Sequence, residues 1–148
     1  MAAEWIDSTY RDYTTPEGVN LDGQPTGEPH FSASLGASYR FDLGDGGALR
    51  LSARHAYRGK VRCNEGSSLQ GNCGISDLLN VGEAQQRTDL RLAWTSVDGQ
   101  WEVAAYGNNV FDHRYVTGLN TYGKDVLGVV GAMVSEPRTY GIEFTVRY

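Results

Sequence analysis

Two cysteines are the residues whose spacing points most directly to chemistry. Cys63 and Cys73 stand in a stretch rich in glycine, serine and asparagine, with nine residues between them. Such a pair in a loop suits a small disulfide clamp, and hence an oxidising compartment. Two free thiols are the alternative. The spacing is not a zinc signature, and no histidine lies nearby to complete one. We therefore expect a disulfide and no metal site.

The other polar motifs lack the partners that catalysis needs. Asp112-His-Arg114 places a histidine beside a carboxylate, but no Gly-x-Ser-x-Gly nucleophile motif accompanies it. Neighbours in a strand point to opposite faces, so we expect a hydrogen-bonding role at a strand end. His30, His55 and His113 are scattered, and Gly44-Asp-Gly-Gly47 lacks the helix start of a phosphate loop. We expect no enzyme and no cofactor.

Long alternating segments would position these motifs. The final segment, from about Arg138 to Tyr148, places Tyr140, Ile142, Phe144, Val146 and Tyr148 on one face, because side chains alternate across a strand. The same alternation predicts strands over 31–43, 49–60, 89–94 and 101–106, and an imperfect one over 2–14. Turns at 44–47 and 96–99 are short. Residues 15–29, 62–84 and 116–134 are expected to be long loops, with the apolar patch Val126–Val130 packed inside the last.

These patterns predict an all-β protein, an antiparallel up-and-down meander of about six long strands. Strands of about ten residues are long enough to cross a bilayer when tilted. Aromatic residues cluster near strand ends, as in the girdles of membrane barrels. A mean hydropathy of -0.43 does not exclude this, because barrel strands alternate. The opposite face carries charges that suit a wet lumen, although a two-sheet sandwich would face solvent with similar residues.

The charge and the first residues bear on partners and location. A formal net charge of -5 makes nucleic acid an improbable partner. Met1-Ala-Ala-Glu-Trp5 has no basic region followed by an apolar core, so no signal peptide is expected there. The protein is then either cytoplasmic or lacks its true N-terminus in this sequence.

Two C-terminal motifs resemble a known family. Gly107-Asn-Asn-Val-Phe-Asp-His-Arg-Tyr115, followed by Glu136-Pro-Arg-Thr-Tyr-Gly-Ile-Glu-Phe-Thr-Val-Arg-Tyr148, is similar to the end of TonB-dependent outer-membrane receptors. Leu35–Phe41 and Tyr57–Lys60 also look like barrel strands of that family, and Val110 replaces its commoner leucine. The resemblance covers nearly the whole chain.

The resemblance implies a fold, a location and a function. It implies a 22-stranded barrel in the outer membrane of a Gram-negative bacterium, plugged by an N-terminal domain that contacts TonB. Residues 1–148 would then be the C-terminal portion of the barrel, without plug or TonB box. Its function would be active import of a scarce nutrient such as a ferric siderophore. Expected partners are lipid, the rest of the receptor and the assembly machinery, which would read Thr139, Gly141, Phe144, Val146 and Tyr148.

The alternative is a soluble or small-barrel binding protein, similar to a lipocalin. Its ligand cavity would be lined by Phe31, Leu35, Tyr39, Leu51 and Trp94. On the receptor reading these side chains face lipid. A compact aqueous protein would also bring Leu35, Leu51, Leu92 and Phe144 together in a closed, dry interior.

Overall fold

The chain folds into one large antiparallel sheet and a small two-stranded one. The computed structural model describes residues 1–64, 73, 79–120 and 128–148. The large sheet has six strands in the order β1-β2-β3-β4-β5-β8, and β6 pairs with β7. The expected all-β fold with an antiparallel sheet of six strands is therefore confirmed, although β1 is short. The strands are β1 (Ala2–Trp5), β2 (Phe31–Asp42), β3 (Ala48–Arg58), β4 (Gln85–Thr95), β5 (Trp101–Asn108), β6 (Val116–Asn120), β7 (Gly131–Val134) and β8 (Thr139–Val146).

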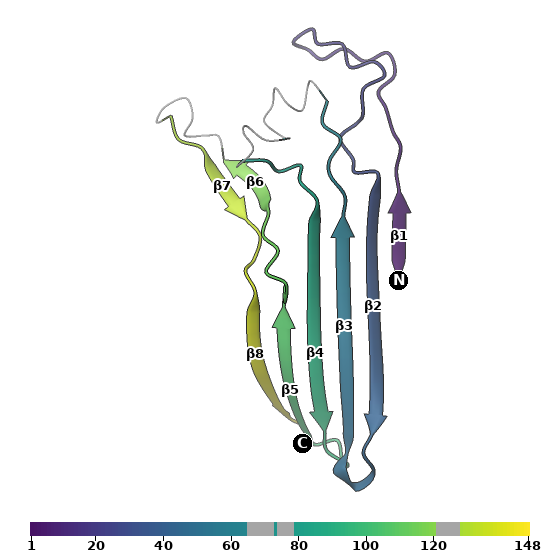
Figure 1. Ribbon diagram of the computed structural model, residues 1–148, viewed down its shortest axis with the longest axis vertical. Coiled ribbons are helices and arrows are strands. Elements are labelled where there is room, and N and C mark those ends of the chain that lie inside the picture. The colour runs from purple at the N-terminus through teal and green to yellow at the C-terminus, as the bar shows by residue number, and fades with distance from the viewer. Residues whose placement is uncertain (65–72, 74–78, 121–127) are drawn as a thin grey trace.

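Short turns lie at one end of the sheet and long connections at the other (Figure 1). A single 3-10 turn, η1 (Gly44–Gly46), joins β2 to β3. A turn closed by the Gly99 amide on the Ser96 carbonyl joins β4 to β5, at 3.0 Å. The connections before β2, β4 and β8 lie at the far end, whereas the C-terminus lies beside the short turns (Figure 1). The predicted short–long pattern of turns is confirmed.

The sharpest alternation gave the longest strands. β2, β3 and β4 have 12, 11 and 11 residues. The register is unbroken between β2 and β3, where Ser32 is opposite Arg58, and between β3 and β4, where Ala48 is opposite Thr95. The expected first strand over 2–14 is largely wrong, because β1 ends at Trp5. Beyond it neither face is consistently apolar, and the chain folds back through isolated bridges at Thr9–Pro25 and Thr14–Asn20.

The region 116–134 also differs from the expectation of a loop. β6 and β7 pair there as an antiparallel ribbon, with a register shift between Val116 and Gly118. Val116–Asn120 and Gly131–Val134 are each four or five residues long and not cleanly alternating, so the sequence signal was weak. Residues 126 and 127 of the Val126–Val130 patch lie outside the described residues.

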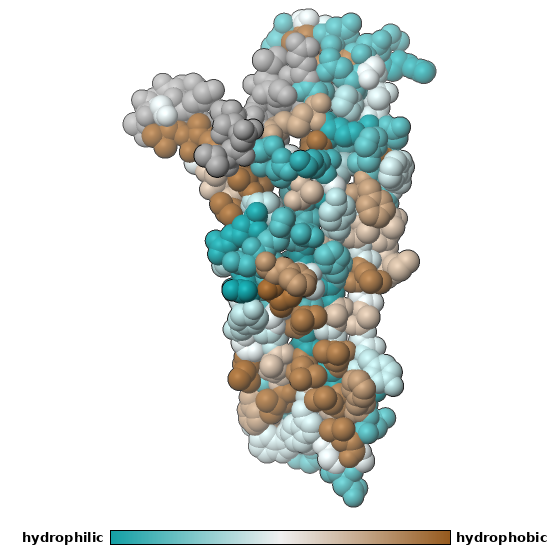
Figure 2. Space-filling view, in the orientation of Figure 1, coloured by the Kyte–Doolittle hydropathy of each residue, from teal (hydrophilic) through white to brown (hydrophobic). Residues whose placement is uncertain are grey.

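Register assigns each side chain of the large sheet to one of two faces. Phe41, Leu49, Trp94, Val103 and Phe144 are successive partners across β2, β3, β4, β5 and β8, and with their alternate neighbours they form what we term the apolar face. The residues between them form the polar face. Figure 2 shows hydrophobic residues gathered over the sheet on the turn side and hydrophilic ones over the long connections.

Burial on the sheet is the reverse of that in a water-soluble domain. Leu35, Leu51, Leu92 and Phe144 on the apolar face are 54%, 45%, 42% and 62% exposed. They do not converge on a closed, dry interior. The buried apolar residues among the described strands of the sheet are only Ala48, Ala93 and Ala104, which lie on the polar face beneath charged side chains. Across the described part of the chain, no helix is long and apolar enough to cross a membrane.

Candidate functional site

The polar face carries a network of ion pairs that joins three strands. Arg91 of β4 donates to Glu102 of β5 at 3.0 Å and to Glu143 of β8 at 2.9 Å. Arg147 donates to the second oxygen of Glu102 at 2.9 Å. The register brings these groups together, because Arg91 lies opposite Tyr106 and Ala104 lies opposite Glu143. Two buried alanines lie beside these groups on the polar face, since Ala93 is opposite Ala104 and Ala104 is opposite Glu143.

A hollow of about 440 Å³ adjoins this network on the polar face. Its charged lining residues are Arg54, Asp89, Arg91 and Glu143. Tyr106 and Asn108 contribute uncharged polar groups. The hollow therefore offers both signs of charge and uncharged hydrogen-bonding groups beside the apolar Ala53 and Leu90.

A second cluster ties the loop end of β5 to the start of β8. Asn109 is 4% exposed, and its side-chain amide donates to the carbonyls of His113 and Glu136 at 3.1 and 3.0 Å. Its oxygen accepts the His113 amide at 3.1 Å. Asp89 accepts the Asn109 amide at 2.9 Å and also binds Arg87. The Gly107–Tyr115 motif thus forms a cluster of hydrogen bonds at the end of β5.

The side chains of Asp112 and His113 contact different partners. The Asp112 carboxylate accepts the backbone amide of Arg138 at 2.9 Å and the Arg114 guanidinium at 3.4 Å. The backbone bond from Arg138 is the main cause that lowers the pKa of Asp112 below its usual range. His113 reaches the carbonyl of Ala84 instead, at 3.4 Å. These contacts agree with the expected strand-end hydrogen bonding, although the residues lie in a turn after β5.

Sequence reasoning missed Asn109, which holds this turn together. Asn109 and Asp112 have φ of 49° and 52°, a region that asparagine and aspartate tolerate better than most residues. The signal was present as the Asn108-Asn109 pair, which is typical of a turn after a strand. No group of three or more His, Cys, Asp or Glu in the described part of the chain could hold a metal ion.

The predicted assembly residues lie along an edge strand. Thr139, Gly141, Phe144 and Val146 belong to β8, which pairs with β5 on one side and forms an edge of the large sheet. Thr139 and Gly141 lie opposite Asn108 and Tyr106 on the polar face, whereas Phe144 and Val146 lie on the apolar face. Tyr148 follows the strand and is fully exposed.

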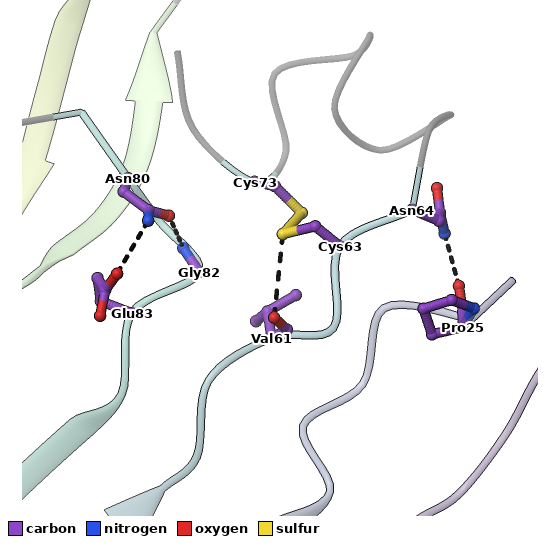
Figure 3. The surroundings of a disulfide bond; sticks show 8 residues. All are labelled: Pro25, Val61, Cys63, Asn64, Cys73, Asn80, Gly82 and Glu83. Atoms are coloured by element: carbon purple, nitrogen blue, oxygen red, sulfur yellow. Dashed lines mark hydrogen bonds between the residues drawn. A yellow bond between two sulfur atoms is a disulfide. The ribbon is translucent and has the colours of Figure 1, made fainter. Parts of the chain in front are cut away.

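The two cysteines form the expected disulfide, with Cα atoms 5.8 Å apart. Figure 3 shows that Asn64, next to Cys63, donates to the carbonyl of Pro25 at 2.7 Å. Arg62 extends the same tie, because its guanidinium binds Asp7 at 2.8 Å and the carbonyls of Ser8 and Glu28 at 3.1 Å. These contacts therefore hold the segment after β3 against the loop before β2, at the end of the sheet that carries the long connections.

Comparisons with protein-family models, with curated proteins and with solved structures found no match for this chain.

Proposed function

We propose that the chain is part of the wall of an outer-membrane β-barrel, the last strands of a 22-stranded TonB-dependent receptor. The receptor would import a scarce nutrient, such as a ferric siderophore. The observation that carries the proposal is the inverted burial of the sheet. Large apolar side chains of five adjacent strands are exposed on one face, while charged groups pair on the other. Lipid outside and water inside would suit both faces.

The height of the apolar face matches a bilayer. On β2 it extends from Phe31 to Phe41, ten residues along the strand. At ~3.3 Å per residue this is about 33 Å of strand. A strand tilted by about 45° would cover about 23 Å of membrane with that length, close to the ~25 Å apolar band of outer-membrane barrels.

The two boundaries of the apolar face descend across the sheet, as tilted strands require. At the loop end, the first apolar-face residue is Phe31 on β2 and Tyr140 on β8. When the paired residues are followed from β8 across β5, β4 and β3 to β2, Tyr140 lies at the height of Ala37. The drop is six residues, about 20 Å, over four strand spacings of ~4.8 Å, about 19 Å. This slope corresponds to a tilt of about 45°, within the range of such barrels.

The turn-end boundary gives a similar slope. The last apolar-face residue is Phe41 on β2 and Tyr148 after β8. Phe41 lies at the height of Phe144, so the boundary drops by the four residues from Phe144 to Tyr148. Four residues, about 13 Å, over about 19 Å correspond to a tilt of about 35°. A sheet in water has no reason to carry two oblique boundaries of similar slope about one bilayer apart.

The remaining parts of the proposal follow from this orientation. The short turns would face the periplasm and the long connections the exterior, where the disulfide fits an oxidising environment. β1 and β8 are edges whose unpaired backbone groups would be costly in lipid, so further receptor strands would close both. The assembly machinery would read β8 at this edge. The plug and the TonB contact would belong to other parts of the receptor, and no enzymatic step or nucleic-acid partner is proposed.

Tryptophan fluorescence tests which medium meets each face. The full chain is reconstituted in phosphatidylcholine vesicles with brominated acyl chains, keeping only Trp101 of the apolar face by Trp5→Phe and Trp94→Phe. Bromine quenches by contact, so we expect strong quenching by the lipid and little by aqueous iodide. The matched control replaces Trp101 with phenylalanine and carries Tyr106→Trp on the polar face, where the two quenchers should exchange roles.

Other outcomes would contradict the proposal. A chain that stays monomeric without detergent, with Trp101 quenched by neither agent, would favour the lipocalin-like binding protein. A detergent-free dimer that shields Trp101 would mean that the apolar face covers a second copy of the chain. Equal quenching by bromolipid in the Trp101 protein and in the Tyr106→Trp control would remove the distinction between the faces on which the barrel depends.

A further inference from the structure

The two halves of the polar face differ in charge balance. On β4, β5 and β8 the arginines are paired, as Arg91 and Arg147 are with Glu102 and Glu143. On β2 and β3 the only acidic residue of this face is Asp42, which binds Arg40 at 2.9 Å. The side chains of three further arginines, all on β3, make no ion pair or hydrogen bond within the described part of the chain. They are Arg50, Arg54 and Arg58.

These three arginines form a row along β3. They are four residues apart, so all three lie on the polar face, at intervals of about 13 Å. β3 runs from the short turns toward the long connections, so the row follows the length of the sheet (Figure 1). Arg54 also feels the charge of Asp89, but that carboxylate is already bound to Arg87 and to the Asn109 amide. All three side chains are exposed.

Small side chains on β2 leave two arginines of the row accessible. Ser32 and Gly36 lie opposite Arg58 and Arg54 in the register. A shallow groove of about 320 Å³ runs over Ser34, Gly36 and Ser38 and is bordered by Arg54 and by Met1. Arg54 also borders the hollow of about 440 Å³ beside the ion-pair network. Arg50 lies opposite Arg40, whose guanidinium is held by Asp42. A solute can therefore approach Arg54 and Arg58 over small side chains of β2, and Arg50 beside an arginine that is already ion-paired.

We propose that Arg50, Arg54 and Arg58 bind a small anion with several carboxylates or phosphates. A guanidinium offers a planar fork of donors that matches carboxylate and phosphate oxygens. The chain as a whole carries a formal net charge of -5, so the row is a local positive strip and not a sign of general basicity. A groove of this volume is at the small end of ligand sites, which favours a compact solute over an acidic polypeptide.

That this anion is the imported cargo rests on the proposed function. In a barrel wall the polar face lines the lumen, and the three arginines become successive stops for an anion moving from the loop end to the turn end. Rings or rows of arginine are a recognised means of selecting anions in pores. The specificity then comes from charge and from the number of acidic groups, since the exposed arginines allow the solute to leave again.

Arginine footprinting with citrate as the probe tests the inference. The full chain in detergent is treated with phenylglyoxal, and the modification rate of each arginine is measured by mass spectrometry. We expect citrate to slow modification of Arg50, Arg54 and Arg58 by about two- to fivefold, the scale of an exposed ion pair. Arg147, which is held by Glu102, serves as the internal control and should keep its rate. Sodium chloride at high concentration should abolish the protection.

Two variants sharpen the assay. Arg54→Gln should reduce the protection of Arg50 and Arg58, because it removes the middle charge, whereas Arg54→Lys should largely preserve it. The matched control is Arg147→Gln on the same face, which should leave the protection unchanged. Unchanged rates with citrate would overturn the inference, and so would protection by a poly-glutamate peptide alone, which would make the occupant a polypeptide.

The result can be separated from that of the membrane assay. If bromolipid quenches Trp101 but citrate protects no arginine, the barrel wall stands and the anion strip fails. If citrate protects the row but Trp101 is not in contact with lipid, the anion site stands on a protein of another architecture, and the cargo role fails.

Discussion

Gly141→Ala tests the close contact between β8 and its neighbour. Gly141 lies opposite Tyr106 on the polar face, and the tyrosine ring covers the glycine. A Cβ atom at this position would collide with the Cζ and Oη atoms of Tyr106 and lie 2.6 Å from its Cε1 atom. The ring must therefore move off the strand. We expect the free energy of unfolding to fall by about 2 kcal/mol, within the usual range for overpacking.

The expected magnitude depends on what the ring loses by moving. The clash involves the far end of the side chain, so rotation of Tyr106 can relieve it without a backbone shift. The cost is then mainly the packing of the ring over the glycine, and this sets it below the cost of a backbone collision. Urea unfolding of the full chain in detergent micelles, followed by tryptophan fluorescence, measures the difference.

Two controls make the prediction specific. Gly36→Ala adds the same methyl group to the polar face of β2, where its nearest atom would be the Ala53 carbonyl oxygen at 4.0 Å. It should be neutral or stabilise by about 0.5–1 kcal/mol, because alanine restricts the unfolded chain. In a Tyr106→Ala background, Gly141→Ala should cost less than about 0.5 kcal/mol, since the clash is gone. Equal effects of Gly141→Ala in both backgrounds would refute the reasoning.

Three further predictions concern the ion pairs, the disulfide and the strand-end turn. Arg91→Leu should lower the free energy of unfolding by about 1 kcal/mol, because it leaves two carboxylates without their shared partner. Arg40→Leu, which removes a single exposed pair, should lower it by less than about 0.5 kcal/mol, and urea unfolding compares the two variants. Replacing both Cys63 and Cys73 with serine should cost about 2.5 kcal/mol by loop entropy, seen as a lower Tm, and a Tm equal to that of the parent would contradict it. The lowered pKa of Asp112 means that its ionised form stabilises the fold above the ordinary carboxyl pKa, and that this contribution is lost as pH falls through the lower, folded value. Asp112→Asn should therefore weaken the fall of stability in acid, and a parallel pH profile would exclude this role.

The alternation of residues made the large sheet predictable, but not its ends. From Phe31 to Asp42 and from Ala48 to Arg58 every residue keeps its expected face, because the period of a strand is two and no proline interrupts it. β6 and β7 were missed because short segments with glycine carry little periodicity. The first strand was overestimated because Trp5 and Tyr10 are strand formers by type, and residue type is a weaker guide than pattern.

The candidate sites were less predictable than the strands, for a different reason. The disulfide could be expected because two cysteines in one loop have few other partners. The Asn108-Asn109 pair indicated a turn, but not the contacts of Asn109. They reach His113 and Glu136, and Glu136 is brought close only by the pairing of β5 with β8. The sequence identifies the polar residues of such a hydrogen-bond cluster, but it does not show which strand ends lie next to each other in the sheet.

The charge asymmetry of the polar face depends on register in the same way. Arg54 lies between Ala53 and His55, and Arg91 lies between Leu90 and Leu92. Neither arginine has an acidic neighbour in the sequence that would mark it as paired or unpaired. Arg91 is neutralised because β5 and β8 bring Glu102 and Glu143 within 3.0 Å, whereas β2 offers glycine opposite Arg54. A shift of one residue in the pairing of β2 with β3 would place side chains of the other face there. The positive strip is thus a property of the paired strands, and an acidic chain can carry it without any basic run in its sequence.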